Sequence, residues 1–406
     1  MIAISRGNVS AEEYATRLQN FRAILTSQGL DAAIIWGRGG GSVDRFSNLC
    51  YLTGFYPVFP TIRDVPGAWS DRGLAALLVT ADEVILFTDD PGALHASHGL
   101  TQVIAREGLT SRTSVGDLVG ILSGMPEICS IGIVGGDAMS GNQARDLLAS
   151  EMLSGRSLVW DDTLLEPLRL YKSEAEIALM RRAAEIAEEA LEAGFAKVVP
   201  GFREADAIAA MAEAVTRNEA VLANAFVVTY DASGAAQDNR LPLHCDRVFQ
   251  AGDLFTIDIS GFFDGYLFDI ARSTVVGAKP LPIQQHAYDL AKGAVNVIVE
   301  GMRPGSVLGE AAHAGSSLLR AAGVDPDGGE FPARGHGLGL GFEGPWVRDD
   351  CQLVLEPGMV ISIEQFVSLE GAGATFERNI LVTENGPEDL VAVRDFWPAV
   401  NGKEAE

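Results

Sequence analysis

The sequence lacks the features that would attach the chain to a membrane or direct it out of the cell. No apolar run approaches the ~20 residues that a membrane-spanning helix requires. The first ten residues, MIAISRGNVS, do not have the basic-then-apolar pattern of a secretion signal. Cys50, Cys129, Cys245 and Cys351 are scattered, with no CxxC pair and no paired spacing. We therefore expect a reduced, cytoplasmic setting.

Positive charge is scarce as well. The chain has 30 Lys and Arg against 55 Asp and Glu, which gives a formal net charge of -25 at pH 7. This excess of acid argues against nucleic acid or an anionic membrane as the main partner. A hydrophobic content of 47%, with 21% charged residues, is typical of a soluble globular protein. A chain of 406 residues is too long for one ordinary core, so we expect two domains.

The first part of the chain alternates helical and strand patterns. Ser10 and Glu13 form a capping box before a run with apolar residues at helical spacing. Short apolar runs follow at 32–36, 77–80, 84–88 and 131–134. This alternation predicts an α/β domain over residues 1–165. The glycine-rich stretch 37–41 lacks the lysine of a P-loop and the spaced glycines of a dinucleotide site, so we interpret it as a flexible loop.

The second part, residues 166–406, contains an internal repeat. Pro200-Gly201 and Pro304-Gly305 each precede a helical run. Gly252 begins an apolar strand that ends at Asp258, and Gly358 begins a similar strand that ends at Glu364. The two copies lie about a hundred residues apart, which indicates a pseudo-twofold α+β domain. Such a duplication would bring carboxylates from both halves to one central site.

The stretch 252–272, GDLFTIDISGFFDGYLFDIAR, is the centre of this domain. Asp264-Gly265 predicts a hairpin, because a type I′ turn needs φ > 0 at both central residues. Asp258 and Asp269 then become diagonal neighbours on one face, roughly 7 Å apart or less. Two carboxylates held so close on an apolar hairpin repel each other and lose hydration. Cations would resolve both problems, and two-metal hydrolytic sites place their ions about 3.5–4 Å apart. A solvated acidic turn is the alternative.

Three more candidate ligands follow. His336 lies in GHGLGLG, where backbone freedom lets a ligand approach closely. Glu364 ends the apolar stretch ISIE, and Glu377 lies in the strand pattern FERNILV. Together with Asp258 and Asp269 they form an oxygen-rich set with one imidazole. This set suits Mn²⁺, Co²⁺, Fe²⁺ or Zn²⁺ better than Ca²⁺ or a thiolate site.

At these residues the chain resembles the pita-bread metallopeptidase family, which includes aminopeptidase P, prolidase, methionine aminopeptidase and the non-peptidase creatinase. Residues 17–30 and 52–55 resemble the creatinase-type N-terminal domain. The stretches IDIS…FDIARS, GHGLGL, EPGMVISIE and FERNILVTENG resemble the catalytic domain. The resemblance implies an α+β pita-bread domain, with a pseudo-twofold antiparallel sheet and helices, preceded by an α/β domain. It also implies a homodimer that acts on a small peptide or another small molecule.

The five candidate ligands match the family's metal ligands residue for residue. The resemblance implies a dinuclear site in which Asp258, Asp269 and Glu377 touch or bridge the ions. His336 and Glu364 would complete the shell. We expect two divalent ions, with Mn²⁺ as the first choice and Co²⁺, Zn²⁺ or Fe²⁺ as alternatives.

The chain departs from the proline peptidases of this family at three positions. They carry a histidine seventeen residues before the first aspartate, where this chain has Leu241, and His244 is the nearest substitute. They carry another histidine seven residues after the metal-binding one, where this chain has Glu343. Their arginine two residues before the last glutamate is Thr375 here, and Arg378 would face the opposite side of the strand.

These features predict a metal-dependent hydrolase. Two ions that share a water would lower its pKa from about 15.7 toward ~7. Glu364, or Glu343 if it points inward, would move the proton, and His244 would stabilise the tetrahedral intermediate.

Three functions are compatible with the sequence. The first is an Xaa-Pro aminopeptidase or dipeptidase. The second is a small-molecule enzyme of the same fold, either a creatinase- or ectoine-hydrolase-like C–N hydrolase or a dimethylsulfoniopropionate lyase-like enzyme. The three departures favour this second function, and Glu343 would suit a cationic group of the substrate. The third is a non-catalytic binding protein, against which the complete ligand set argues.

Overall fold

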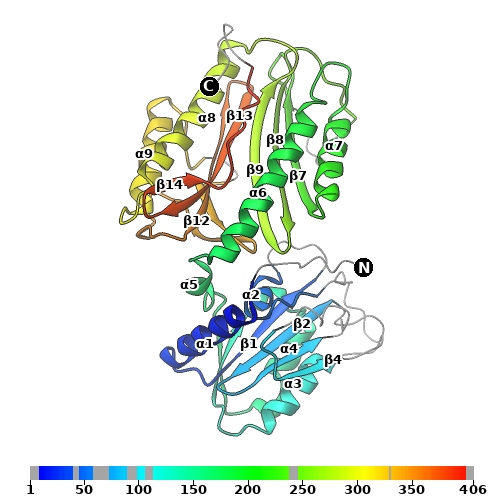
Figure 1. Ribbon diagram of the computed structural model, residues 1–406, viewed down its shortest axis with the longest axis vertical. Coiled ribbons are helices and arrows are strands. Elements are labelled where there is room, and N and C mark those ends of the chain that lie inside the picture. The colour runs from blue at the N-terminus through cyan, green and yellow to red at the C-terminus, as the bar shows by residue number, and fades with distance from the viewer. Residues whose placement is uncertain are drawn as a thin grey trace. The chain divides into compact units, whose positions relative to one another are not determined.

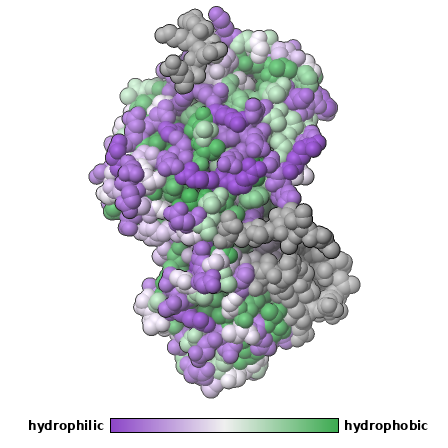
Figure 2. All heavy atoms as spheres, in the orientation of Figure 1, coloured by the Kyte–Doolittle hydropathy of each residue, from purple (hydrophilic) through white to green (hydrophobic). Residues whose placement is uncertain are grey.

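The computed structural model describes residues 9–39, 45–57, 73–88, 98–105, 113–236, 246–328 and 331–398 (Figure 1). The chain divides between Arg169 and Leu170 into two compact units. Among the described residues, no helix is both long enough and apolar enough to cross a membrane. Hydrophilic residues are spread over the face of both units that Figure 2 shows, in keeping with the 21% of charged residues.

The N-terminal unit is a mixed sheet with helices, as the alternation of patterns predicted. Its strand order is β4-β3-β2-β1-β5-β6, in which β1 pairs antiparallel with β2 and parallel with β5. The strands are β1 (Ala32–Arg38), β2 (Leu74–Thr80), β3 (Val84–Thr88), β4 (Gln102–Ala105), β5 (Ser130–Val134) and β6 (Ser157–Trp160). The helices are α1 (Ala11–Ser27), α2 (Ser47–Thr53), α3 (Thr113–Ser123), α4 (Gly141–Leu148) and α5 (Glu166–Arg169).

The four predicted apolar runs of this unit correspond to β1, β2, β3 and β5, which are buried. The edge strands β4 and β6 are shorter and more exposed, and their runs of three apolar residues did not indicate them. The predicted cap of α1 is confirmed, since the Ser10 hydroxyl accepts a hydrogen bond from Glu13 N at 3.1 Å. The prediction of a loop over residues 37–41 is wrong for Gly37 and Arg38, which belong to β1. Residues 40–41 lie outside the described part.

The C-terminal unit consists of two similar halves, which confirms the predicted pseudo-twofold α+β fold. In each half a pair of helices precedes antiparallel strands. The first half has α6 (Glu174–Phe195), α7 (Glu204–Arg217), β7 (Val221–Tyr230), β8 (Leu254–Phe263) and β9 (Tyr266–Val275). The second has α8 (Pro282–Gly301), α9 (Leu308–Ala321), β10 (Gly335–Leu338), β11 (Phe342–Trp346), β12 (Val360–Leu369), β13 (Ala372–Thr383) and β14 (Gly386–Asp389).

The strands of the two halves meet at β9 and β13. The strand orders are β7-β8-β9 in the first half and β11-β10-β12-β13-β14 in the second. Across the junction, the hydroxyl of Thr256 donates to the carbonyl oxygen of Gly373 at 2.8 Å, and Thr375 N donates to the hydroxyl of Ser273 at 2.8 Å. Figure 1 shows α6 and α7 beside the strands of the first half, and α8 and α9 beside those of the second.

Alternation along the strands decides which side chains the helices cover. In β8, Phe255 and Ile257 are fully buried in a core with residues of α6 and α7. In β12, Ile361 and Ile363 are fully buried in a core with residues of α8 and α9. The residues between them therefore point to the face away from the helices. This is the face that carries the candidate metal ligands.

Candidate metal centre

The first hairpin of the site, β8–β9, has the predicted turn and register. Its turn residues Asp264 and Gly265 have φ values of 50° and 88°. Ser260 lies opposite Asp269, and Asp258 lies opposite Ala271. The two aspartates are therefore diagonal neighbours on one face, as the sequence predicted.

The second hairpin, β12–β13, repeats this arrangement with glutamates. Its turn residues Glu370 and Gly371 have φ values of 46° and 84°. Glu364 lies directly opposite Glu377. The sequence did not predict this turn, because a glutamate at positive φ is uncommon. The Glu-Gly pair between two apolar strands was the signal that could have revealed it.

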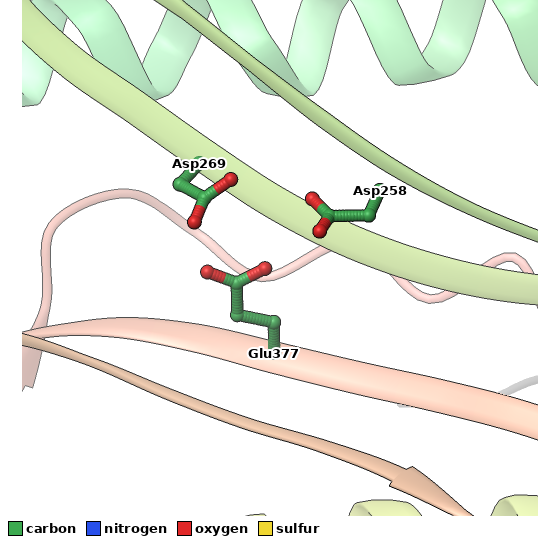
Figure 3. A group of neighbouring side chains, drawn as sticks. All are labelled: Asp258, Asp269 and Glu377. Atoms are coloured by element: carbon green, nitrogen blue, oxygen red, sulfur yellow. The ribbon is translucent and has the colours of Figure 1, made fainter. Parts of the chain in front are cut away.

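The two hairpins bring three carboxylates together. Asp258, Asp269 and Glu377 each offer an oxygen, and these oxygens all lie within 4.8 Å of one another. Figure 3 shows the carboxylates of the two aspartates on one side and that of Glu377 on the other, pointing toward one another. Residues more than a hundred positions apart in the chain thus share one small space.

His336 and Glu364 lie beside this group. His336 Nε2 is 3.2 Å from Asp269 Oδ2 and 3.6 Å from Glu364 Oε1. His336 Nδ1 is 2.9 Å from the carbonyl oxygen of Gly337. Because a carbonyl oxygen only accepts hydrogen bonds, we infer that Nδ1 carries a proton. Nε2, which faces the carboxylates, is then the nitrogen that could bind a metal. The structure thus brings all five candidate ligands into one cluster.

Burial and mutual repulsion make it difficult for these carboxyl groups to ionise. Burial raises the pKa of Asp258, and burial together with repulsion by Asp258 raises that of Asp269 well above its ordinary value. Burial and repulsion by Glu377 raise the pKa of Glu364 well above its ordinary value. Burial and repulsion by Asp258 raise the pKa of Glu377 to about 7, although a hydrogen bond from Ser362 opposes this shift. The cluster therefore favours a bound cation or bound protons.

The donor set fits a divalent metal. Asp258 Oδ1 and Glu377 Oε2 are buried and have no hydrogen-bond partner among the described residues. Buried carboxylate oxygens without partners are uncommon in folded proteins, and a bound ion is one way in which such oxygens are satisfied. Four carboxylates with one imidazole form the oxygen-rich set that Mn²⁺, Fe²⁺, Co²⁺ or Zn²⁺ accepts. The residues present could therefore hold a metal centre.

Two polar side chains outside the cluster hold the backbone of its members. Asn379 Nδ2 donates to the carbonyl oxygen of Asp269 at 2.7 Å. The buried Arg272 donates to the carbonyl oxygen of Glu377 at 2.8 Å and pairs with Glu188 of α6 at 3.0 Å. The sequence did not predict these contacts. In the sequence, the feature that marks these two residues is their position: Asn379 lies two residues after Glu377, and Arg272 lies three residues after Asp269.

Glu343, a candidate if it points inward, forms an ion pair. Its carboxylate pairs with Lys172 Nζ at 3.4 Å and accepts a hydrogen bond from Leu340 N at 2.9 Å. The neighbouring Phe342 faces His336, with 4.9 Å between ring centroids, so alternation along β11 turns Glu343 away. The roles of Glu343 in proton transfer and in binding a cationic group therefore stay predictions.

The other departures have different outcomes. Leu241 and His244 lie outside the described residues, so the role of His244 stays a prediction. Thr375 is buried and donates to the carbonyl oxygen of Gln365 at 3.0 Å. Arg378 pairs with Asp389 of β14 at 2.6 Å, which confirms that it faces away from the cluster.

A two-domain fold with clustered carboxylates and one histidine at the junction of two similar halves defines the class of pita-bread metallohydrolases. The chain belongs to metallopeptidase family M24, whose model matches residues 178–384. The Creatinase/Prolidase N-terminal domain matches residues 17–170. Both findings agree with the resemblance recognised in the sequence.

Curated relatives of this chain carry peptidase names. It is 27% identical over 372 residues to the uncharacterized peptidase YqhT of Bacillus subtilis, covering 91% of this chain and 96% of that protein. It is 31% identical over 233 residues to the Xaa-Pro dipeptidase of Pyrococcus furiosus, covering 56% of this chain. That second match spans 65% of the dipeptidase, slightly less than two thirds of its length.

Solved structures show the same fold over the whole chain. The prolidase from Pyrococcus horikoshii superposes with a TM-score of 0.75 at 21% identity, covering 94% of this chain and 99% of that one. The N-terminal domain of the FACT complex subunit SPT16 from Cicer arietinum does so with a TM-score of 0.70 at 14% identity, covering 94% of this chain and 97% of that one. At these identities the likeness shows the fold alone, and activity has to be argued from the side chains.

Proposed function

We propose that this chain is a metal-dependent Xaa-Pro peptidase. The observation that carries the proposal is the convergence of Asp258, Asp269 and Glu377, whose oxygens lie within 4.8 Å of one another, beside His336 and Glu364. The relatives named Xaa-Pro dipeptidase support the substrate class. A non-catalytic binding protein would have no need of this complete set of buried ionisable groups.

The small-molecule alternative has lost one of the features that favoured it. Glu343 was expected to suit a cationic group of the substrate. Its ion pair with Lys172 supports a structural role instead. The replaced histidines and arginine still distinguish the chain from other proline peptidases, so creatine, ectoine and dimethylsulfoniopropionate belong in the substrate assay beside the peptides.

We assign the five converging residues to two divalent ions, with Mn²⁺ as the first choice. When bound, such ions supply Lewis-acid activation of water and of the substrate carbonyl. Glu364 is our candidate for the residue that holds the transferred proton. Its side chain is 19% exposed, against 2% for His336 and 4% for Asp269, so solvent and substrate reach it more easily than they reach those two residues. His244 is the candidate for stabilising the tetrahedral intermediate.

Metal analysis and one substitution test this function. Purified protein incubated with Mn²⁺ is expected to retain metal through gel filtration and to cleave Xaa-Pro dipeptides or longer Xaa-Pro peptides. Asp269→Asn should lower both retained metal and kcat/KM by at least about a hundredfold, because it removes a shared ligand. Asp350→Asn, in an exposed ion pair with Arg348, is the control and should change neither. Full turnover by Asp269→Asn, or turnover only of the small molecules, would refute the proposal.

We further propose a cytoplasmic homodimer. The family resemblance supports the dimer, and the free thiols of Cys129 and Cys351 support a reducing compartment. Light scattering during gel filtration is expected to give about twice the 43.0 kDa of one chain. A monomer at micromolar concentration would refute the dimer.

A further inference from the structure

The segment after β14 lies across both halves of the C-terminal unit. We call residues 394–397 of this irregular segment the clasp. Phe396 packs against the core that contains residues of α6 and α7, and Trp397 packs against the core that contains residues of α8 and α9. The Phe396 ring stacks on Phe195 of α6, with 4.2 Å between ring centroids. The Trp397 ring stacks on Tyr288 of α8, with 4.1 Å between ring centroids. Two adjacent residues thus join the cores of the two halves.

The backbone of the clasp is bound to β9 of the first half. The carbonyl oxygen of Arg394 accepts a hydrogen bond from Arg272 Nε at 2.8 Å. The carbonyl oxygen of Phe396 accepts one from the hydroxyl of Thr274 at 2.7 Å. The Arg394 side chain also pairs with Glu192 of α6. The clasp is therefore fixed to the first half at both β9 and α6.

Asp395 binds the clasp to the second half. Its carboxylate accepts hydrogen bonds from the Tyr288 hydroxyl at 2.6 Å and from Lys292 Nζ, both on α8. It also accepts one from Trp397 N at 2.9 Å, which fixes the backbone of the clasp. Trp397 Nε1 donates to the side chain of Gln285 of α8 at 2.9 Å. Because the Asp395 side chain is 21% exposed, water only partly screens its charge-assisted bonds.

The side chains that the clasp holds surround Phe376, the residue before Glu377. Phe376 is buried in the core on the helix side of β13. The guanidinium carbon of Arg272 and the ammonium nitrogen of Lys292 lie 4.8 and 5.2 Å from its ring centre. Tyr288 meets the same ring edge to face at 6.1 Å, and Arg272 also donates to the carbonyl oxygen of Glu377 at 2.8 Å. Adjacent residues of a strand point to opposite faces, so contacts that fix Phe376 from the helix side also fix Glu377 on the other side.

We infer that the clasp positions Glu377. It holds three side chains against Phe376, and these keep β13 in the place against β9 at which Glu377 reaches the two aspartates. This inference rests on the proposed metal centre. Asp395 and Trp397 act through Phe376, so they are positioning residues. Replacing residues that orient metal ligands typically costs about 10–100-fold in metal affinity, and the clasp, one layer further out, is expected near the lower end of that range.

Loss of the Trp397 ring is the first test, made in the full chain. Trp397→Ala is expected to raise the dissociation constant for Mn²⁺ about tenfold, because Tyr288 loses the ring that stacks on it. Trp397→Phe keeps an aromatic ring there and should stay within about threefold of the wild-type value. Trp160→Ala is the control, since Trp160 lies in β6 of the N-terminal unit, is 43% exposed and should leave Mn²⁺ affinity unchanged. Wild-type affinity in folded Trp397→Ala would overturn the inference.

A milder variant decides the inference if Trp397→Ala does not fold. Asp395→Asn keeps the size of the side chain but removes the charge that binds Lys292, and it should raise the Mn²⁺ dissociation constant about threefold or more. Asp350→Asn, in an exposed pair with Arg348, is its control. In Co²⁺-loaded protein, Asp395→Asn should also change the visible absorption spectrum, which reports the ligand geometry around the ion and which a loss of overall stability alone would not change. Unchanged affinity with an unchanged spectrum would overturn the inference.

Hydrogen exchange of metal-free protein tests the clasp without any bound ion. Trp397→Ala and Asp395→Asn are both expected to speed amide exchange in β9 and β13 at least about threefold, and to leave β1, β2 and β3 of the N-terminal unit unchanged. Wild-type protein that retains no Mn²⁺ would refute the proposed function, and exchange in β13 would then still decide the role of the clasp. Wild-type exchange rates in β13 of both variants would overturn the inference while leaving the proposed peptidase function intact.

Discussion

Replacement of Arg272 by methionine is expected to destabilise the C-terminal unit and to weaken its metal centre. The Arg272 side chain is 1% exposed and pairs with Glu188 at 3.0 Å. It also donates to the carbonyl oxygens of Glu377 and Arg394, each at 2.8 Å. Its guanidinium lies 4.8 Å from the ring centre of Phe376. One side chain thus joins α6, β13 and the segment after β14.

The magnitude follows from what the substitution leaves behind. Methionine fills much of the space, so the main cost is the buried charge of Glu188 and the carbonyl oxygens that lose a charged donor. Removing one partner of a buried ion pair typically costs about 3–5 kcal/mol. We expect Arg272→Met to lower the free energy of unfolding by that amount. Adding Glu188→Gln should restore part of it, because the unpaired charge is then gone.

The loss is expected to depend on pH. Burial raises the pKa of Glu188 even in the wild-type protein, and the charge of Arg272 opposes that shift. Without Arg272 the folded protein holds a proton on Glu188 at a higher pH than the unfolded chain does. The folded state then binds more protons, so stability falls as pH rises from the ordinary glutamate pKa through the raised one. The variant should therefore be closest to wild type near pH 5.

Urea denaturation of metal-free protein at pH 5 and pH 8 measures both effects. Arg217→Met is the control, because Arg217 is 75% exposed in its pair with Glu213 and should cost less than about 1 kcal/mol. Manganese titration of folded Arg272→Met should also show weaker binding, since the Glu377 backbone has lost its donor. A loss no larger than that of Arg217→Met, or one that Glu188→Gln does not reduce, would refute the reasoning.

Three further predictions concern the site. Because the pKa of Glu377 is raised to about 7 without metal, and those of Asp269 and Glu364 are raised as well, Mn²⁺ affinity should fall at least about tenfold per pH unit below 7, and calorimetry in two buffers should detect released protons. Ser362→Ala should move the midpoint of this pH dependence to higher pH, because the hydroxyl of Ser362 lowers the pKa of Glu377. An unchanged midpoint would contradict this prediction. Glu343→Gln should lower the free energy of unfolding by more than about 1 kcal/mol, because Lys172 loses its charged partner. The variant should keep kcat within about threefold of the wild-type value. A large loss of kcat in the folded variant would instead indicate a catalytic role for Glu343.

The parts of the fold that the sequence predicted correctly depend on local signals. The turn at Asp264-Gly265 followed from two adjacent residues that tolerate positive φ, and the register of the hairpin followed from the turn. With the register known, alternation alone placed Asp258 and Asp269 on one face. The internal repeat extended the same reasoning to Glu364, since each copy has a glycine before an apolar strand.

The parts that the sequence did not predict depend on contacts between distant residues. Glu343 pairs with Lys172, which lies 171 positions earlier in the chain. Arg272 pairs with Glu188 across 84 positions. Neither pair has a periodic or local pattern, because the partners meet only after helices and strands have packed. The sequence also did not indicate that Phe331, Phe342 and Trp346 surround His336, because nothing in their spacing places them around one imidazole.

The proposed ligands are divided between the two halves, which would link stability to metal binding. The first half supplies Asp258 and Asp269, and the second supplies His336, Glu364 and Glu377. Neither half offers the whole set, so the cluster forms only when β9 and β13 lie in register. Without metal, the carboxyl groups of the cluster have raised pKa values. At neutral pH the folded protein then either keeps protons bound to these groups or contains carboxylates that repel one another. Bound ions remove that cost and join the halves. Changes that shift β13 against β9 should therefore weaken metal binding before they unfold either hairpin.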